Sequence, residues 1–184
     1  MMWLAAHLDL ADGDIVARPH TQASAKGQDF LVVHRNEQSV VALTICDDKA
    51  TDNARNIGRE EVWPEIAAYE AGGRRDKLRS NVIATLGLAG IPEEESIALV
   101  RRTPEKELRR YRVRVASSGT RTKTLFKGFD DVVPGPLERR RGESVNIPHL
   151  RKWMAELAGK VEAALRDYAT GGLGPEQAVT VASW

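Results

Sequence analysis

Two carboxylates and one lysine stand where they could act together on a bound ion. The sequence predicts a strand over residues 39–49 that ends in the charged triplet Asp47, Asp48 and Lys49. Because successive strand residues point to opposite faces, Asp47 and Lys49 share one face. If the strand predicted over residues 29–35 is the hairpin partner, Asp29 lies across from the same end. Such oxygen ligands suit Mg²⁺ or Mn²⁺, which can hold a phosphate and acidify a water molecule.

This pattern resembles the PD-(D/E)xK nuclease superfamily, whose signature is an acid at the start of one strand and D/E-x-K on the next. The matching residues are Gln28-Asp29 and Asp47-Asp48-Lys49, with Gln28 in place of the usual proline. The resemblance implies a restriction-endonuclease-like fold and a metal-dependent phosphodiesterase. It implies Asp29 and Asp47 as catalytic metal ligands, and Lys49 as the catalytic group that positions the nucleophile or stabilises negative charge.

A purely structural explanation of the same residues stays open. With 8 lysines and 26 acidic residues in the chain, about one D/E-x-K triplet is expected by chance, and one occurs. Three charged residues are also an ordinary way for a strand to leave a sheet. Many members of the superfamily carry a further upstream acid, for which Asp12 and Asp14 are the candidates, so the number of metal ions is open.

Basic residues are concentrated in the second half of the chain. Residues 1–95 carry 10 Lys/Arg and 16 Asp/Glu, whereas residues 96–184 carry 17 and 10. Residues 101–127 alone hold 10 Lys/Arg and 2 Asp/Glu, and three arginines alternate with apolar residues in a predicted strand. Such a face would follow a phosphate backbone, although a solvated or subunit-contacting surface, or helix capping near residue 53, would produce the same pattern. The predicted nucleic-acid-binding residues are Asn53, Arg55, Arg110, Arg112, Arg114, Arg121 and Lys123.

The predicted elements form an α/β fold, with a central mixed sheet of about four or five strands flanked by helices. Strands are expected at residues 29–35, 39–49, 97–102 and 110–115. One helix is expected from about residue 59 to the interruption at Gly72-Gly73, and a second from there to residue 87. A third is expected over residues 147–168, where an amphipathic pattern predicts packing on the sheet. The proline- and glycine-containing segment over residues 133–141, which ends in three arginines, is expected to form an exposed loop. We expect one nuclease-like domain over residues 1–170 and a loosely held tail over residues 171–184.

Composition and missing motifs exclude several other classes. Cys46 is the only cysteine, so neither an intrachain disulfide nor a thiolate zinc cluster can form. The four histidines lack metal-ligand spacing, and no P-loop, dinucleotide-binding fingerprint or nucleophile elbow occurs. The apolar segment over residues 1–10 is too short to span a bilayer. We therefore expect a cytoplasmic protein without membrane association.

These observations lead to three competing hypotheses. The first is a Mg²⁺-dependent (or Mn²⁺-dependent) endodeoxyribonuclease that acts on DNA, and the family analogy suggests bacterial restriction or antiphage defence. The second is a non-catalytic module that grips nucleic acid through the basic strand. The third is an assembly subunit of a larger complex. A homodimer or a partner protein of a defence complex is compatible with the first hypothesis.

Overall fold

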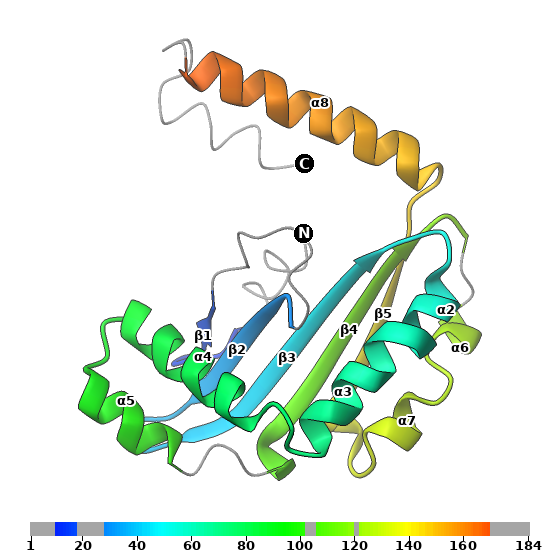
Figure 1. Cartoon of the computed structure of the whole chain (residues 1–184). Helices are drawn as coiled ribbons and strands as arrows, with labels where there is room; N and C mark the ends of the chain where they lie inside the picture. The colour runs from blue at the N-terminus through cyan, green and yellow to red at the C-terminus, as the bar shows by residue number, and fades with distance from the viewer. Residues whose placement is uncertain (1–9, 18–27, 102–105, 120–121, 170–184) are drawn as a thin grey trace. The chain divides into compact units, whose positions relative to one another are not determined.

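A mixed five-stranded sheet forms the centre of the fold. The computed structural model describes residues 10–17, 28–101, 106–119 and 122–169. Strands lie side by side in the order β1-β2-β3-β4-β5 (Figure 1). β1, β2 and β3 pair antiparallel, whereas β3, β4 and β5 pair parallel. The expectation of an α/β fold with a central mixed sheet is thus confirmed. The strands are β1 (Ile15–Val16), β2 (Phe30–Arg35), β3 (Val40–Ala50), β4 (Arg109–Ser117) and β5 (Arg140–Asn146).

The β2–β3 hairpin follows the sequence prediction almost residue for residue. Its turn is held by Asn36, whose side-chain oxygen accepts hydrogen bonds from the backbone N–H groups of Gln38 (3.0 Å) and Ser39 (2.8 Å). The pairing register shifts next to the turn, where His34 opposes Ala42 and Arg35 opposes Val40. The residue between them on β3, Val41, is therefore a bulge. Beyond it the strands run in regular register to the pair of Phe30 and Cys46.

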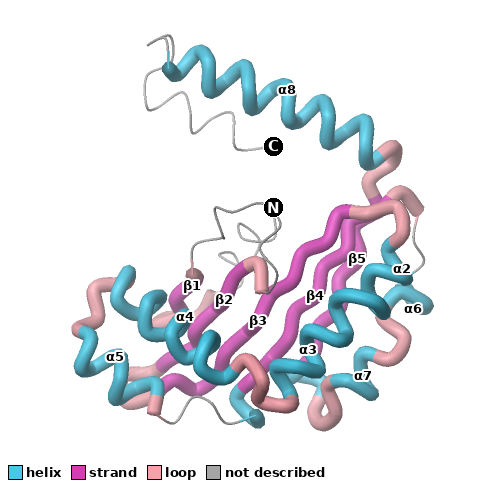
Figure 2. Tube along the Cα trace, in the orientation of Figure 1, coloured by secondary structure: helices cyan, strands magenta, loops and turns pink. Residues whose placement is uncertain are grey.

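Helices cover one face of the sheet (Figures 1 and 2). A continuous helical stretch follows β3, and its middle turn is π-helical. The chain then turns through a glycine pair into two further helices. Leu43 and Ile45 of β3 and Val113 of β4 pack against Val82 and Leu86 in the main core. These helices are α2 (Ala54–Ile57), the π-helical η1 (Gly58–Val62), α3 (Trp63–Glu70), α4 (Arg75–Leu88) and α5 (Glu93–Val100).

The other face of the sheet has a smaller apolar cluster. Phe30, Val32 and Cys46 form it, and Leu10 and Val16 pack against it. These strand residues alternate with those of the main core, as the period of two in a strand requires. Each strand thus supplies side chains to two different environments.

The strand predicted over residues 97–102 is wrong, because most of this segment belongs to helix α5. Three glutamates occupy the first turn, directly after Pro92. Acidic residues at a helix N-terminus are stabilised by the helix dipole, and the apolar run that follows fits a buried helix as well as a strand. The turn expected at residues 103–105, between this segment and the next predicted strand, falls outside the described residues.

The exposed loop predicted over residues 133–141 is also partly wrong. The short 3₁₀ helix η3 (Leu137–Arg139) follows Pro136, and strand β5 begins at Arg140. Arg139 is not a solvated cation, since its guanidinium donates to Glu70 Oε1 at 2.7 Å and to the carbonyl of Pro134 at 2.8 Å. Arg139 therefore connects the segment before β5 to Glu70 of α3 and is not part of an exposed basic surface. The remaining short elements are η2 (Lys106–Leu108), α6 (Thr122–Leu125) and α7 (Phe129–Val132).

The chain divides into two compact units, Met1–Asn146 and Ile147–Trp184. The described part of the second unit contains α8 (Leu150–Ala169), which confirms the helix predicted over residues 147–168. The packing of this helix on the sheet stays a prediction. Its apolar residues recur at helical spacing, including Met154, Leu157, Val161 and Leu165. The tail predicted over residues 171–184 lies outside the described residues. No helix in the described part of the chain has the length and apolar character needed to cross a membrane.

Candidate active site

Asp29 and Asp47 meet at one end of the β2–β3 hairpin. The paired register of the two strands ends with Phe30 and Cys46, so the next residues along, Asp29 and Asp47, oppose each other. The Asp29 N–H donates to the carbonyl of Cys46 at 2.9 Å, which continues the ladder by one residue. The Asp29 side chain accepts a hydrogen bond from the backbone N–H of Asp48. The sequence prediction that an acid before β2 lies beside the end of β3 therefore holds.

Asp47 and Lys49 form a close ion pair on the helix-covered face. Lys49 Nζ lies 2.5 Å from Asp47 Oδ1, and the two side chains are 25% and 9% exposed. Burial raises the pKa of Asp47 to about 6, although Lys49 pulls it down, and the charges of Asp29 and Glu65 add to the rise. Burial lowers the pKa of Lys49, but attraction to Asp47 outweighs it, so the net shift is upward. A carboxyl group that titrates near neutrality, beside a charged lysine, is typical of functional sites.

A cleft of about 490 Å³ opens in front of this ion pair. Four acidic residues and two basic ones line it, which gives it an acidic character. Glu60 and Glu61 come from the π-helical turn η1, and Glu65 comes from α3. Such π turns occur frequently at functional sites. The lining residues are Asp47, Lys49, Glu60, Glu61, Pro64, Glu65, Ala68 and Arg74.

The glutamates that the helix brings to this cleft were not predicted from the sequence. Glu61 and Glu65 are four residues apart, so both lie on one helix face. Glu65 lies 3.8 Å from Arg74, a long ion pair that closes one side of the cleft. The four-residue spacing of the two glutamates, on the helix that follows the strand ending in Asp47 and Lys49, could have predicted their place in the cleft.

Gln28 and Tyr69 hold the chain at the entry to β2. Gln28 is buried, and its side-chain oxygen accepts a hydrogen bond from the Tyr69 hydroxyl at 3.2 Å. This contact ties the residue before Asp29 to α3, the helix that also carries Glu65. Gln28 thus has a positioning role, because it fixes the backbone next to Asp29.

The donor set fits a hydrated divalent cation better than a metal enclosed by protein. Among residues 10–17, 28–101, 106–119 and 122–169, no group of three or more His, Cys, Asp or Glu side chains is arranged to hold a metal ion. Mg²⁺ commonly uses one or two protein carboxylates and keeps several waters. Asp29 and Asp47 supply two carboxylates. One oxygen of Asp47 already contacts Lys49, and one oxygen of Asp29 already accepts a hydrogen bond from the Asp48 N–H.

The basic face of β4 is turned away from this cleft. Tyr111, Val113 and Val115 point into the main core, as predicted, so the alternating arginines at 110, 112 and 114 lie on the opposite side of the sheet. Two of these arginines meet a carboxylate: Arg112 Nε donates to Glu143 Oε1 at 2.8 Å, and Arg114 Nη2 donates to Glu143 Oε2 at 2.6 Å. A nucleic acid held by these arginines would not lie over Asp47.

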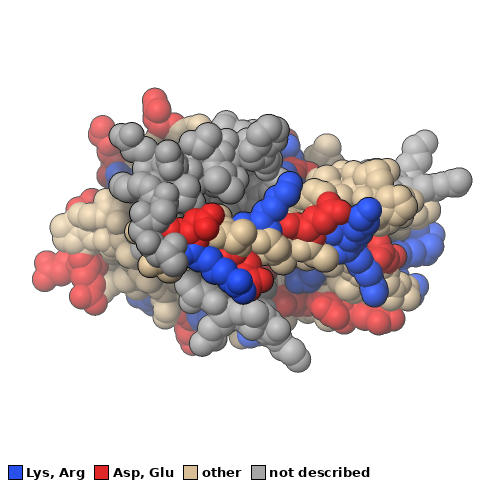
Figure 3. Space-filling model, turned by 90° about the horizontal axis from the view of Figure 1, so that it is seen from above, with Lys and Arg blue, Asp and Glu red and all other residues tan. Residues whose placement is uncertain are grey.

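The other predicted nucleic-acid contacts are scattered. Asn53 is exposed and precedes α2, and its side chain makes no capping hydrogen bond to the helix. Arg55 is exposed and lines a separate cavity of about 280 Å³ with Arg59 and Lys127. Arg121 lies outside the described residues, and Lys123 lies in α6. On the face seen in Figure 3, acidic and basic side chains are intermixed.

The candidates for an upstream acid do not reach the cleft. Asp14 Oδ2 lies 2.8 Å from His34 Nδ1, and His34 in turn contacts Thr44, which alternates with the cleft-facing residues of β3. Asp12 is exposed in the turn before β1. The described residues therefore bring together Asp29, Asp47 and Lys49, with Glu61 and Glu65 facing them from the helix.

Comparisons of the chain with protein-family models, with curated proteins and with solved structures gave no significant match.

Proposed function

We propose that this chain is a metal-dependent nuclease of the PD-(D/E)xK kind, with a restriction-endonuclease-like domain that hydrolyses phosphodiester bonds in DNA. One observation carries the proposal: Asp47 and Lys49 line a cleft of about 490 Å³ at the end of the β2–β3 hairpin, and Asp29 opposes Asp47 from the neighbouring strand. The resemblance to the superfamily depends on these three residues. Their convergence supports it, because a chance triplet would need no acid on the neighbouring strand.

Asp29 and Asp47 are the residues that would hold Mg²⁺ or Mn²⁺, which when bound would polarise the phosphate and lower the pKa of a water. Lys49 carries an ammonium group that can donate to a phosphate oxygen and offset charge that develops in the transition state. The hydrogen bond from the Asp48 amide fixes the orientation of Asp29, so one acid is preorganised by backbone. The acidic lining would also make cleavage depend on a metal ion, because a cleft of this charge repels phosphate until cations neutralise it.

The biological setting follows from the same proposal. Cys46 is buried, and no other cysteine occurs in the sequence, which is compatible with a reducing cytoplasm. Bacterial restriction or antiphage defence, with a homodimer or a partner protein that completes the DNA-binding surface, is the setting that the superfamily resemblance suggests.

Cleavage assays test the proposal directly. Purified protein is incubated with plasmid and single-stranded DNA in Mg²⁺, in Mn²⁺ and in EDTA, over a range of salt concentrations. Asp47→Ala and Lys49→Ala should each lower the cleavage rate by at least about 100-fold. Asp130→Ala, which removes an exposed carboxylate on α7, is the matched control and should cut normally. Absence of cleavage by the unaltered protein, or full cleavage by Asp47→Ala, would contradict the proposal.

A DNA-binding module that does not cut is the second candidate, and the alternating arginines of β4 favour it. Binding measured at several salt concentrations separates the two candidates. A module would bind DNA with the same affinity in the Asp47→Ala variant and would lose affinity in Arg110→Gln, without cleavage in any metal.

A further inference from the structure

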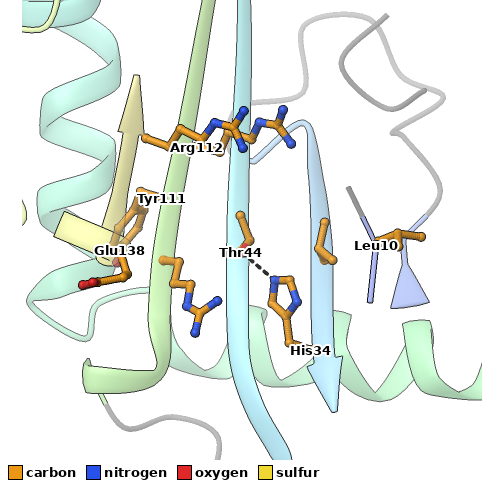
Figure 4. Close-up of a pocket in the computed structure, with 9 residues that line it drawn as sticks. Leu10, His34, Thr44, Tyr111, Arg112 and Glu138 are labelled. Carbon is orange, nitrogen blue, oxygen red and sulfur yellow. Dashed lines mark hydrogen bonds between the residues drawn. The ribbon is translucent and has the colours of Figure 1, made fainter. Parts of the chain in front are cut away.

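Another cavity lies on the face of the sheet opposite the acidic cleft. It has a volume of about 200 Å³ and is lined by nine residues from β2, β3, β4, η3, β5 and the segment before β1. Figure 4 shows His34, Thr44 and Arg112 projecting from neighbouring strands around it. Three arginines and one glutamate are among the lining residues, so its charge is opposite in sign to that of the cleft. The lining residues are Leu10, Val32, His34, Thr44, Arg110, Tyr111, Arg112, Glu138 and Arg141.

A chain of hydrogen bonds fixes the polarity of Thr44. His34 lies between Asp14 Oδ2, 2.8 Å from Nδ1, and Thr44 Oγ1, 2.7 Å from Nε2. An ionised carboxylate only accepts hydrogen bonds, so Nδ1–H donates to Asp14. In the neutral ring, Nε2 then accepts the hydroxyl proton of Thr44. Thr44 Oγ1 therefore has lone pairs with which it can accept a hydrogen bond from a donor group of a ligand in the cavity.

Asp14 is itself held in place, which makes this chain rigid. Its Oδ2 also accepts the backbone N–H of Ala11 at 3.1 Å, and its side chain is 6% exposed. His34 and Thr44 sit on adjacent antiparallel strands, where diagonal side chains come within reach of each other. The acceptor at Thr44 is thus preorganised by three elements of the fold.

Guanidinium groups supply the donors of the same cavity. Arg112 and Arg141 both contact Glu143 Oε1, with their Nε atoms at 2.8 and 2.7 Å, and this shared carboxylate fixes the two side chains on adjacent strands. Arg110 is exposed and lines the cavity from the same face of β4. Arginine matches phosphate because its planar fork presents parallel N–H donors.

We infer that this cavity binds a small phosphate monoester that carries a free hydroxyl group, such as a sugar phosphate. The arginines bind the phosphate, and the Thr44 oxygen accepts the ligand hydroxyl. The volume is below the range of about 300–1,000 Å³ that is usual for drug-sized ligands, so the occupant is small. This site is separate from the proposed nuclease cleft, because alternate residues of β3 face the two sides of the sheet.

Calorimetric titration with inorganic phosphate and with ribose 5-phosphate tests the inference. Ribose 5-phosphate should bind at least about fivefold more tightly than inorganic phosphate, because only the sugar phosphate offers a hydroxyl to Thr44. Arg110→Gln should weaken binding of both ligands by about tenfold or more. Thr44→Val should lower the affinity for ribose 5-phosphate to that for inorganic phosphate, while leaving the latter unchanged.

Two controls keep the result specific. Asp47→Asn changes the opposite face and should bind both ligands as the unaltered protein does, whether or not the chain cuts DNA. Far-ultraviolet circular dichroism establishes that each variant is folded, and Thr44→Ser, which keeps the hydroxyl, should restore the preference for ribose 5-phosphate. Absence of saturable binding at millimolar concentrations, or equal binding by Arg110→Gln, would overturn the inference.

Discussion

Replacing Lys49 with methionine should destabilise the fold by an amount that grows with pH. The pKa of Asp47 is about 6 in the folded chain, against 3.8 for the ordinary group. Because the folded state holds this proton more tightly, the contribution of Asp47 to stability falls as pH rises from about 4 to about 6. A rise from 3.8 to about 6 corresponds to about 3 kcal/mol. Lys49 limits this loss, since its charge lowers the pKa of Asp47.

The magnitude follows from the geometry of the pair. Breaking a buried ion pair by removing one partner costs about 3–5 kcal/mol, and an exposed pair is worth about 0–1 kcal/mol. Lys49 is 25% exposed and Asp47 is 9% exposed, so an intermediate cost of about 1–3 kcal/mol is expected at pH 8. At pH 5 the Asp47 carboxyl is largely protonated in the folded state, and most of the electrostatic part of this cost disappears.

Urea unfolding followed by tryptophan fluorescence, in EDTA at pH values from 5 to 8.5, measures the effect. Lys152→Met is the matched control, because Lys152 is 78% exposed and its partner Glu156 lies 3.8 Å away. A double variant, Asp47→Asn with Lys49→Met, should recover stability at pH 8 relative to Lys49→Met alone. Equal destabilisation by Lys49→Met at pH 5 and pH 8 would refute the electrostatic argument.

Three other measurements test the core, the thiol and the back of the sheet. Leu86→Ala should cost about 2–5 kcal/mol of unfolding free energy, because Leu86 is fully buried, whereas Leu88→Ala, at a 66% exposed position, should cost far less. Burial raises the pKa of Cys46 to about 12, so at pH 8 it should react with a disulfide reagent only after urea unfolds the chain. Burial raises the pKa of Glu143, but hydrogen bonds from Arg114 and Arg112 outweigh it and the net shift is downward. Glu143→Gln should therefore destabilise the fold near neutral pH, and the difference from the unaltered protein should shrink as pH falls below about 4.

The hairpin that carries the proposed catalytic residues could be predicted because its signals are local. Residues 29–35 and 39–49 are apolar and β-branched, and the polar segment between them contains Asn36, which holds the turn. The alternation of β3 then places Asp47 and Lys49 on one face without any knowledge of the rest of the fold.

Strand β5 could not be predicted, because its sequence carries little apolar signal. Its residues Arg140–Asn146 are largely polar, and burial is intermediate or low throughout. The strand pairs with β4, and Glu143 meets arginines that lie about thirty residues away in the sequence. Long-range pairing of this kind leaves no periodic pattern. For the same reason the sequence could not show that the arginines of β4 face away from Asp47.

Helix α5 could have been predicted, because the sequence contains a helix start signal. The apolar, β-branched run was instead interpreted as a strand. Residues 97–100 are apolar and include two β-branched residues, which favours a strand. The helix start signal in Pro92 and the three glutamates that follow was the better guide, since acids in the first turn favour helix.

The bulge at Val41 has a consequence for how this chain tolerates insertions and deletions. Strand side chains alternate, so one extra residue inserted directly after Leu43 would turn Thr44 toward the helices and Asp47 to the other side, and both sites would be lost together. A deletion at Val41 would instead remove the bulge and leave the register beyond Ala42 intact. Length variation among descendants of this sequence should therefore concentrate on the turn side of Ala42, and the segment from there to Lys49 should be inherited at fixed length.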